Sequence, residues 1–266
     1  MLSIIVVCLN AGTKLKSTIE SVINQTSKDY EVIIQDGGSN DCSVEEALKI
    51  CSDDVKSKIK IYTEPDNGIY DAMNKAVKRA EGQYVIFLNA GDYLFDKDTI
   101  QKITDEINFE KADIYYGFMK QRALDTFVYP APVIDDFTCY RNVPCHQTCI
   151  YSLKLFETRG YDIKYRVRAD YEHFLWCFYE AKAKIKYIEI PVSSYEGGGF
   201  SETKENKKNS AIEHREIVVK YMGLKKANHY RRIMRLTLQP LRTKMAESEA
   251  LSGLYNKIKS VIYKNK

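Results

Sequence analysis

Apolar and polar positions in the N-terminal part of the chain follow two alternating patterns. Short runs rich in β-branched residues stand between longer segments whose apolar residues recur at helical spacing. The runs predict buried strands and the longer segments predict amphipathic helices. We expect strands at 3–8, 30–35, 58–63 and 84–88, and helices around 15–23, 43–51 and 70–80. Strands that alternate with helices predict an α/β fold, with helices on both faces of a parallel sheet.

Polar residues follow each of these strands directly. Asn10 follows the first strand, 36–41 the second, 64–67 the third and 89–92 the fourth. Parallel α/β sheets bind ligands at the carboxyl ends of their strands, so the four clusters predict one shared crevice. The alternative is that Asn, Asp and Gly stand there only as turn residues.

The remainder of the chain has a less regular pattern. We expect a strand with polar interruptions over 143–150, a helix over 168–181 and a charged helix over 205–221. Three consecutive glycines at 197–199 predict a mobile loop.

Charge is distributed unevenly along the 266 residues, which carry a net charge of +4. Residues 225–266 contain 11 Lys or Arg residues and 2 acids, a net charge of +9, which leaves −5 for residues 1–224. The mildly acidic body speaks against nucleic acid as its partner. The basic tail favours an anionic surface as a partner.

Cysteine usage and hydropathy favour a cytoplasmic protein. Cys8 and Cys177 lie within apolar runs and are expected to be buried thiols. The segment 139–149 holds three cysteines and a histidine but lacks the Cys-x-x-Cys pair of many zinc sites, so we do not expect zinc. We find no signal peptide before the first strand and no apolar run of about 18 residues.

Asp92 has a position suited to a divalent cation, because it follows a buried strand in a turn that contains glycine. Mg²⁺ and Mn²⁺ prefer oxygen ligands and share their coordination shell with phosphates. A cation held there would neutralise charge that develops on a departing diphosphate. The alternative is that Asp92 is only a turn residue and binds no cation.

Five ordered segments resemble the sequence blocks of family 2 inverting glycosyltransferases, which have the GT-A fold: 3–10, 19–25, 36–41, 66–75 and 82–92. The likeness extends over about 2–200 and points to bacterial enzymes that build capsule, exopolysaccharide or lipopolysaccharide chains. It implies a Rossmann-like, mostly parallel mixed sheet flanked by helices. It also implies transfer of a hexosyl or N-acetylhexosaminyl group from a nucleotide-sugar donor, usually UDP-linked, to a glycan or lipid-linked acceptor.

The resemblance also implies roles for individual residues. Asp36 would accept a hydrogen bond from the base of the donor. Asp92 would match the metal-binding aspartate of the Asp-x-Asp type motif, with Mn²⁺ or Mg²⁺ as cofactor. This chain has Asn89 where many relatives have an acid, and Gly91 replaces another, so the motif keeps one carboxylate. The nucleotide cleft would be lined by Cys8, Asn10, Glu64, Asp66, Ala90 and Gly91.

Asp170 matches the position of the catalytic base in the same family. In an inverting transfer the acceptor hydroxyl attacks opposite the departing diphosphate and loses its proton as the new bond forms. A positioned carboxylate that takes this proton contributes about 10²–10⁴-fold. Glu172 is the alternative base, and a helix N-terminal acid stabilised by the helix dipole is the structural alternative for Asp170.

Two further segments match the family near the diphosphate and the acceptor. His146 would contact one of these groups, although a hydrogen-bonded structural histidine is the alternative. Gly198 and Ser201 belong to a glycine–serine segment that would order over the diphosphate and exclude water, which is a competing acceptor. An ordinary surface loop is the alternative for that segment.

The tail carries an apolar stripe at helical spacing, flanked by lysines, over 251–262. Such a stripe suits the headgroup layer of an anionic membrane and would bring the enzyme to acceptors at the inner face of the plasma membrane. A helix pair that docks on the catalytic domain or forms an oligomer is the alternative. We divide the chain into a nucleotide-sugar-binding half at 1–110, an acceptor-binding and catalytic half of the same domain at 111–222, and a basic amphipathic helical tail at 223–266.

Three other function classes are less favoured. A sugar nucleotidyltransferase needs a Gly-rich, Arg-containing phosphate loop after the first strand, and 10–14 is a poor version. A non-catalytic sugar-binding or scaffold protein would tolerate the loss of Asp92 and Asp170. A dehydrogenase is disfavoured because no Gly-x-Gly-x-x-Gly follows a strand. The donor sugar, the acceptor and the linkage depend on pocket shape and are not readable from the sequence.

Overall fold

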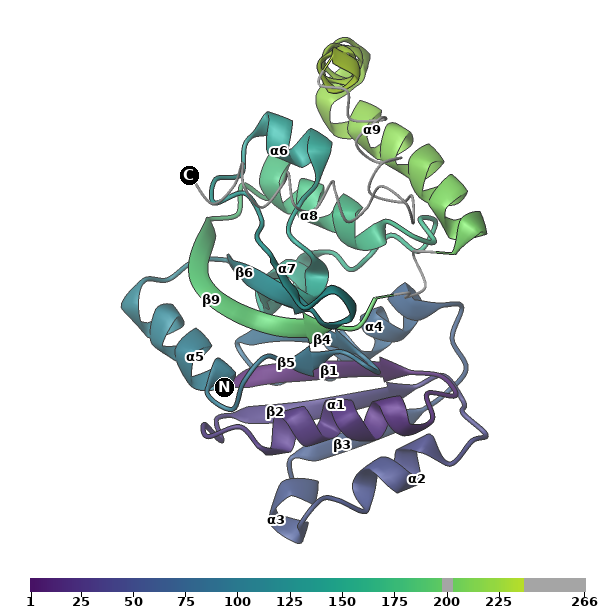
Figure 1. Cartoon of the computed structure of the whole chain (residues 1–266), viewed down its shortest axis with the longest axis vertical. Helices are drawn as coiled ribbons and strands as arrows, with labels where there is room; N and C mark the ends of the chain where they lie inside the picture. Colours follow the sequence, from purple (N-terminus) through teal and green to yellow (C-terminus); the bar gives the residue numbers. More distant parts are fainter. Residues whose placement is uncertain (198–202, 237–266) are drawn as a thin grey trace. The chain divides into compact units, whose positions relative to one another are not determined.

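The computed structural model describes residues 1–197 and 203–236 (Figure 1). The chain divides into two compact units, Met1–Ile217 and Val218–Lys266. All the contacts that follow lie within the first unit. None of the described helices combines the length and the apolar character that a membrane span needs. The apolar stripe expected over 251–262 lies outside the described residues.

The N-terminal part of the first unit alternates strands and helices as the sequence predicts. The helix expected over 43–51 ends early, and a short second helix follows it. The elements are β1 (Leu2–Cys8), α1 (Thr13–Ile23), β2 (Tyr30–Asp36), α2 (Ser43–Leu48), α3 (Asp53–Lys56), β3 (Ile59–Thr63), α4 (Ile69–Val77) and β4 (Tyr84–Asn89).

The remaining elements follow a less regular order. Two 3-10 helices, η1 and η2, interrupt it, and the backbone of the last helix leaves the helical conformation at Gly223. The elements are β5 (Tyr93–Leu94), α5 (Thr99–Phe109), β6 (Ile114–Gln121), η1 (Arg122–Leu124), β7 (Thr126–Val128), α6 (Asp136–Arg141), η2 (His146–Thr148), β8 (Cys149–Ser152), α7 (Leu153–Thr158), α8 (Ala169–Tyr179), β9 (Ile185–Tyr195) and α9 (Lys204–Leu236).

The strand expected over 143–150 is wrong for most of its length. A turn of 3-10 helix occupies His146–Thr148, and the strand begins at Cys149. The Thr148 amide and hydroxyl both donate to the carbonyl of Cys145, at 2.9 and 2.8 Å, which closes this turn. The polar residues that interrupt the apolar pattern therefore form the turn that precedes the strand.

The sheet is mixed, and most of its paired residues are parallel. Its order is β3-β2-β1-β4-β8-β6-β9-β5, with β7 paired to β6. The first four strands are parallel to one another, whereas β8 is antiparallel to both β4 and β6. The register pairs Cys8 with Asp36 and Val7 with Asn89, so the polar clusters after these strands share one edge.

Helices cover both faces of the parallel part (Figure 1). Every residue of β1 and β2 is buried, as expected for strands with apolar runs, whereas β3 alternates partly buried and exposed residues. Alternate residues of β1 pack with α1 and α5 in one core cluster. Burial on both faces explains why these strands are continuous apolar runs and not half-polar ones.

Candidate active site

The loops after the first three strands are connected to one another. The Asn10 amide donates to Ser39 Oγ at 2.8 Å, and the Asn40 amide donates to Asn10 Oδ1 at 3.0 Å. A Cβ on Gly37 would lie 2.5 Å from Asp66 Oδ2, so only glycine leaves room for this carboxylate. The clusters predicted to converge therefore do so at the carboxyl edge of the sheet.

Asp36 lies beneath this edge and is only 2% exposed. Both of its oxygens accept from the Ser39 amide at 3.1 Å, and the Ser39 hydroxyl donates to Oδ1. Cys8 Sγ lies 3.7 Å from the same oxygen, and burial, followed by the charge of Asp36, raises the pKa of Cys8 to about 12. Cys8 is therefore a neutral thiol.

A large hollow of about 1020 Å³ opens over these strand ends. This volume is at the upper end of the range for small-molecule sites in proteins. Asp36 and Glu64 are not among its lining residues. The predicted residues that do line it are Cys8, Asn10, Asp66, Ala90, Gly91 and Asp92.

Glu64 has a different partner. Its carboxylate forms a 2.5 Å ion pair with Arg79, which also donates to Gln35. The side chain thus joins β3 to the helix behind it. The role of Glu64 in lining the nucleotide cleft stays a prediction.

Asp92 lies in the large hollow and is 5% exposed. Gln147 Nε2 donates to its Oδ2 at 3.1 Å, and the Asp92 amide closes a turn with the Asn89 carbonyl at 2.9 Å. Burial raises the pKa of Asp92, and the bond from Gln147 opposes this in part.

The donor set at Asp92 fits a cation that shares its ligands with a diphosphate. No group of three or more His, Cys, Asp or Glu side chains that could hold a metal occurs among the described residues. However, Asn89 Oδ1 is buried without a hydrogen-bond partner and lines the same hollow as Asp92. Mg²⁺-type sites use one or two protein oxygens and leave the other positions to phosphate and water.

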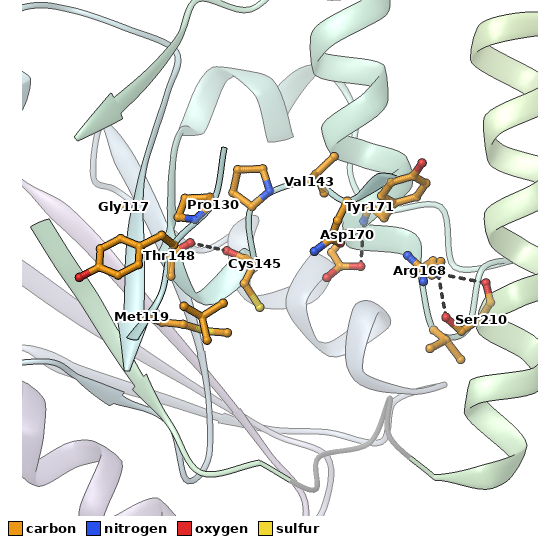
Figure 2. A pocket seen from close by; sticks show the side chains of 15 residues that line it. Gly117, Met119, Pro130, Val143, Cys145, Thr148, Arg168, Asp170, Tyr171 and Ser210 are labelled. Atoms are coloured by element: carbon orange, nitrogen blue, oxygen red, sulfur yellow. Dashed lines mark hydrogen bonds between the residues drawn. The ribbon is translucent and has the colours of Figure 1, made fainter. Parts of the chain in front are cut away.

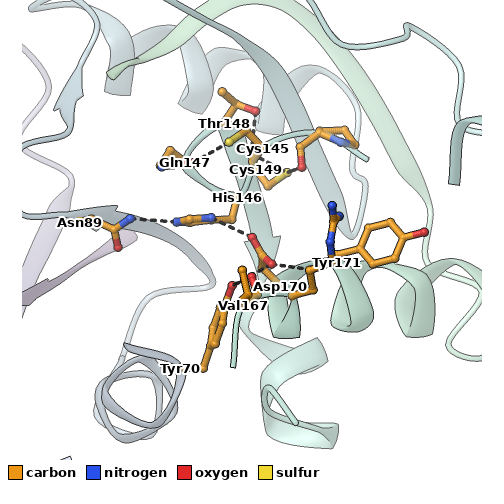
Figure 3. A network of polar contacts seen from close by, with 12 residues as sticks. Tyr70, Asn89, Cys145, His146, Gln147, Thr148, Cys149, Val167, Asp170 and Tyr171 are labelled. Carbon is orange, nitrogen blue, oxygen red and sulfur yellow. Dashed lines mark hydrogen bonds and ion pairs between the residues drawn. The ribbon is translucent and has the colours of Figure 1, made fainter. Parts of the chain in front are cut away.

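Asp170 stands at the centre of a polar network (Figure 3). Tyr70 Oη donates to Asp170 Oδ1 at 2.9 Å, and the backbone amide of Tyr171 donates to the same oxygen at 2.8 Å. His146 Nδ1 lies 3.0 Å from Oδ2, and Asn89 Nδ2 lies 3.4 Å from His146 Nε2. A hydrogen-bonded line therefore connects the end of β4 to the start of α8.

The network keeps Asp170 ionised. Burial raises the pKa of Asp170, but the hydrogen bond and charge of His146 and the bond from Tyr70 outweigh it, so the pKa is lowered. Burial and the nearby Asp170 charge raise the pKa of Tyr70 well above its usual value, so Tyr70 stays a donor. A carboxylate that is charged at neutral pH can accept a proton.

The loop before α8 is fixed by α9. Glu213 accepts from the backbone amides of Val167 and Arg168 at 3.0 and 2.8 Å. The Arg168 side chain donates in turn to Ser210 Oγ at 2.7 Å. These bonds determine where α8 begins and hence where Asp170 points.

Glu172 occupies a separate environment. It is fully buried, and both of its oxygens accept from Arg159 Nη2, at 2.7 and 2.6 Å. It lines neither hollow described here. Its carboxylate is bound in an ion pair inside the protein, so the structure offers no contact that supports a role of Glu172 at the acceptor or the diphosphate, and that role stays a prediction. Gly198 and Ser201 lie outside the described residues.

A second hollow, of about 380 Å³, includes Asp170 in its lining (Figure 2). Tyr70 and Asn89 line the large hollow, so the network has one end in each. This arrangement suits a reaction between two molecules that occupy one hollow each, with Asp170 beside the second.

Several residues of the site were missed by sequence reasoning. Tyr70 is the second residue of α4, and only the fold shows that it reaches Asp170. Lys14 and Arg166 line the large hollow and bring positive charge to it. A Cβ on Gly91 would lie 3.4 Å from Lys14 Cδ, which places the lysine stem beside the turn before Asp92. No local pattern marks any of these three side chains.

Comparison with known proteins gives the family. Residues 3–179 match the family model described as "Glycosyl transferase family 2". A "PGL/p-HBAD biosynthesis glycosyltransferase" of Mycobacterium bovis is 35% identical over 206 residues, 76% of this chain and 80% of that protein. The "Uncharacterized glycosyltransferase EpsJ" of Bacillus subtilis is 30% identical over 136 residues, 51% of this chain and 38% of that protein.

Solved structures confirm the predicted GT-A fold. S. aureus TarS 1–349 has a TM-score of 0.65 at 18% identity and covers 83% of this chain and 66% of its own. The mannosyltransferase PcManGT from Pyrobaculum calidifontis, solved with GDP-Man and Mn²⁺, has a TM-score of 0.66 at 12% identity and covers 96% of this chain and 83% of its own. The chain therefore belongs to glycosyl transferase family 2 and is an enzyme that transfers a sugar from a sugar-nucleotide donor.

Proposed function

We propose that this enzyme is an inverting glycosyltransferase that moves a sugar from a UDP-linked donor to a hydroxyl of a glycan or lipid-linked acceptor. The observation that carries the proposal is the network in which Asp170, held by three donors, joins the hollow that contains Asp92 to a second hollow. The name of the mycobacterial relative and the TarS structure with UDP-GlcNAc support the same reaction class. Synthesis of a bacterial surface polysaccharide or glycolipid is the proposed setting.

The large hollow is proposed to hold the donor. Cys8, Asn10 and Asp66 line the end formed by the first three strands, which suits a nucleoside. Lys14 and Arg166 supply positive charge for the diphosphate. Asp36 supports this end through its bonds to Ser39, and its contact with the base of the donor stays a prediction.

Asp92 and the Asn89 amide oxygen are proposed to hold Mn²⁺ or Mg²⁺. When bound, the cation supplies positive charge that stabilises the departing diphosphate. Asp92 must be ionised to act as a ligand. Because burial raises its pKa, we expect metal-supported donor binding to weaken on acidification at a higher pH than an exposed aspartate would give.

Asp170 is proposed to take the proton of the acceptor hydroxyl. A bond forms between the acceptor oxygen and the anomeric carbon, the bond from that carbon to the diphosphate oxygen breaks, and the diphosphate leaves with the electron pair. Attack opposite the leaving group inverts the anomeric configuration. Two donors occupy Asp170 Oδ1 and one occupies Oδ2, so Oδ2 keeps a lone pair that can take the proton.

His146 is proposed to be a positioning residue. Nδ1 faces Asp170 Oδ2 and carries the proton donated to it, while the Asn89 amide lies beside the other ring nitrogen, Nε2. The ring thus holds the carboxylate in one orientation and favours its charged form. This role replaces the direct contact with diphosphate or acceptor expected from the sequence.

A panel of nucleotide sugars tests the function. We expect one UDP-sugar to bind more tightly with Mn²⁺ than without it, and this difference to disappear in Asp92→Ala. Asp105→Asn is the matched control, because Asp105 is exposed on α5 and lines neither hollow. NMR of the product formed from that donor should show an inverted anomeric centre. A product of retained configuration would overturn the mechanism, and release of pyrophosphate would indicate a nucleotidyltransferase.

The basic tail is proposed to bind an anionic membrane surface, since residues 225–266 carry a net charge of +9. We expect the full chain to float with phosphatidylglycerol-containing liposomes and not with neutral ones. The variant Lys257→Glu, Lys259→Glu, Lys264→Glu should lose this binding. Equal flotation of the variant and the wild type would end the idea.

A further inference from the structure

The smaller hollow has walls of two different kinds. Asp170 contributes the carboxylate, and Figure 2 shows it lying between Cys145 and Arg168. Apolar side chains of β6, of the segment that follows it and of the loop before η2 also line the hollow: Met119, Val128, Tyr129, Pro130, Val143 and Pro144.

Tyr129, which lines this hollow, also belongs to an aromatic cluster on the β6–β7 hairpin. We name Phe118, Phe127 and Tyr129 the hairpin shelf; Val128 shares the other face of the hairpin with Met119. The Tyr129 ring lies 4.6 Å from the Phe118 ring, and the Phe127 ring lies 5.6 Å from Phe118. Phe127 and Tyr129 are 42% and 62% exposed. Contiguous exposed apolar side chains beside a site mark a surface that another molecule covers.

Several polar groups of the small hollow are committed to the protein, whereas Asn142, which also lines it, is exposed. Thr148 Oγ1 donates to the Cys145 carbonyl at 2.8 Å, and Cys145 Sγ donates to Gln147 Oε1 at 2.7 Å. Arg168 Nε donates to the Ser210 carbonyl and hydroxyl. A site for a long, fully polar glycan would be expected to present more donors and acceptors to it.

We infer that the acceptor carries an apolar aglycone, an aryl ring or an alkyl chain, next to the hydroxyl that is glycosylated. The aglycone lies on the hairpin shelf, and the hydroxyl faces Asp170 Oδ2. The inference rests on the proposed function, since it identifies the second hollow as the acceptor site. It adds the chemical class of the acceptor, which the fold alone does not give.

The shelf is rigid enough to select a ring or a chain. Tyr129 is held against Phe118, whose exposed fraction is only 9% because β6 lies inside the sheet. Gly117, next in the strand, could not carry a Cβ, which would lie 2.4 Å from the Ile190 carbonyl oxygen of β9. This close packing fixes the backbone beneath the shelf, so an aglycone meets a preformed surface.

Matched glycosides test the inference. Methyl, octyl and p-nitrophenyl glycosides of glucose, galactose, mannose, rhamnose and N-acetylglucosamine are titrated into the full chain saturated with UDP and Mn²⁺. For at least one sugar, the octyl or the p-nitrophenyl glycoside should bind at least tenfold more tightly than the methyl glycoside, about 1.4 kcal/mol. Tighter binding of the octyl glycoside would identify an alkyl chain as the aglycone, and tighter binding of the p-nitrophenyl glycoside would identify an aryl ring.

Variants of the shelf show whether it carries this preference. Tyr129→Ala should abolish the tenfold difference and Tyr129→Phe should retain it, while UDP binds both as it binds the wild type. Phe109→Ala is the control, since Phe109 is 85% exposed at the end of α5 and lines neither hollow. Equal affinity of all three glycosides for every sugar, or an unchanged preference in Tyr129→Ala, overturns the inference. If the wild-type protein does not bind UDP at all, the result contradicts the proposed function and not the inference about the acceptor.

Discussion

The two hollows are built by different means. The large one is formed by the carboxyl ends of neighbouring parallel strands, so residues that directly follow each strand reach it. The small one combines β6, the hairpin, the loop before η2, the start of α8 and one residue of α9. The first depends on regular sheet geometry and the second on tertiary packing. Chemistry that is shared across a fold is therefore expected in the first, and selectivity for an acceptor in the second.

The strongest test of the difference between the two hollows is whether Asp170 acts in catalysis or only in the structure. We expect Asp170→Asn to lower kcat by about 10²–10⁴-fold, because the amide cannot take the proton. Binding of the UDP-sugar should stay within about twofold, since Asp170 lines the other hollow. Quenched time-course assays of sugar transfer measure kcat, and titration calorimetry measures the affinity for the UDP-sugar. Near-normal turnover in this variant would remove Asp170 as the base.

Glu172 sharpens the comparison, since it lies two residues from Asp170 and faces the interior. Glu172→Ala leaves Arg159 without its carboxylate partner. Breaking a fully buried pair costs about 3–5 kcal/mol, and we expect about 2–3 kcal/mol of unfolding free energy here because Arg159 is 25% exposed. Urea denaturation measures this. The kcat per folded molecule should change little, and a loss as large as that of Asp170→Asn would restore Glu172 as a candidate base.

The pH dependence of kcat tests the contact of His146 with Asp170, which links the two hollows. In His146→Ala the main group that lowers the pKa of Asp170 is lost while burial remains, so the pKa should rise. At saturating donor and Mn²⁺, the acidic limb of the kcat profile should move to higher pH, with kcat about tenfold lower at neutral pH. His146→Gln keeps an N–H donor and should recover part of the loss. An acidic limb at the wild-type pH would show that His146 does not act on Asp170.

The smallest effect concerns the stability of the donor side. Because the folded protein raises the pKa of Asp92, its ionised form is destabilising at neutral pH. This cost begins to fall as the pH drops through the folded pKa and is gone below the pKa of Asp92 in the unfolded chain. Asp92→Asn should therefore raise the Tm of the metal-free protein, by roughly 2–4 °C for each kcal/mol gained. Differential scanning fluorimetry without metal, with Asp105→Asn as control, measures this. A lower Tm than that of the control would contradict the raised pKa.

Sequence patterns predicted the donor side better than the acceptor side. The apolar runs of β1, β2 and β4 identify buried parallel strands, and the polar residues after them lie in the crevice for that reason. The wrong strand at 143–148 arose because the alternation of Cys145–Thr148 comes from a closed turn and not from a pleated sheet.

Long-range partners account for what the sequence could not show. Asp170 was identified through family resemblance, but its donors Tyr70 and His146 come from positions 100 and 24 residues away. The ion pair of Glu172 was not foreseen because its partner, Arg159, is separated from it by a loop whose path depends on packing. The ion pair of Glu64 with Arg79 was not foreseen either, because the two residues meet only after β3 and α4 are in place.

Strand β8 has a consequence for how the enzyme can change its substrates. It pairs directly with β4, so Asn89 at the end of one strand and His146 just before the other are joined by sheet backbone and not by a flexible connection. The spacing between the proposed cation ligands and the proposed base is therefore set by this pair of strands. Loops around either hollow can lengthen, shorten or exchange side chains while this spacing stays constant. Redesign of the acceptor preference should accordingly start at the hairpin and leave the β4–β8 pair untouched.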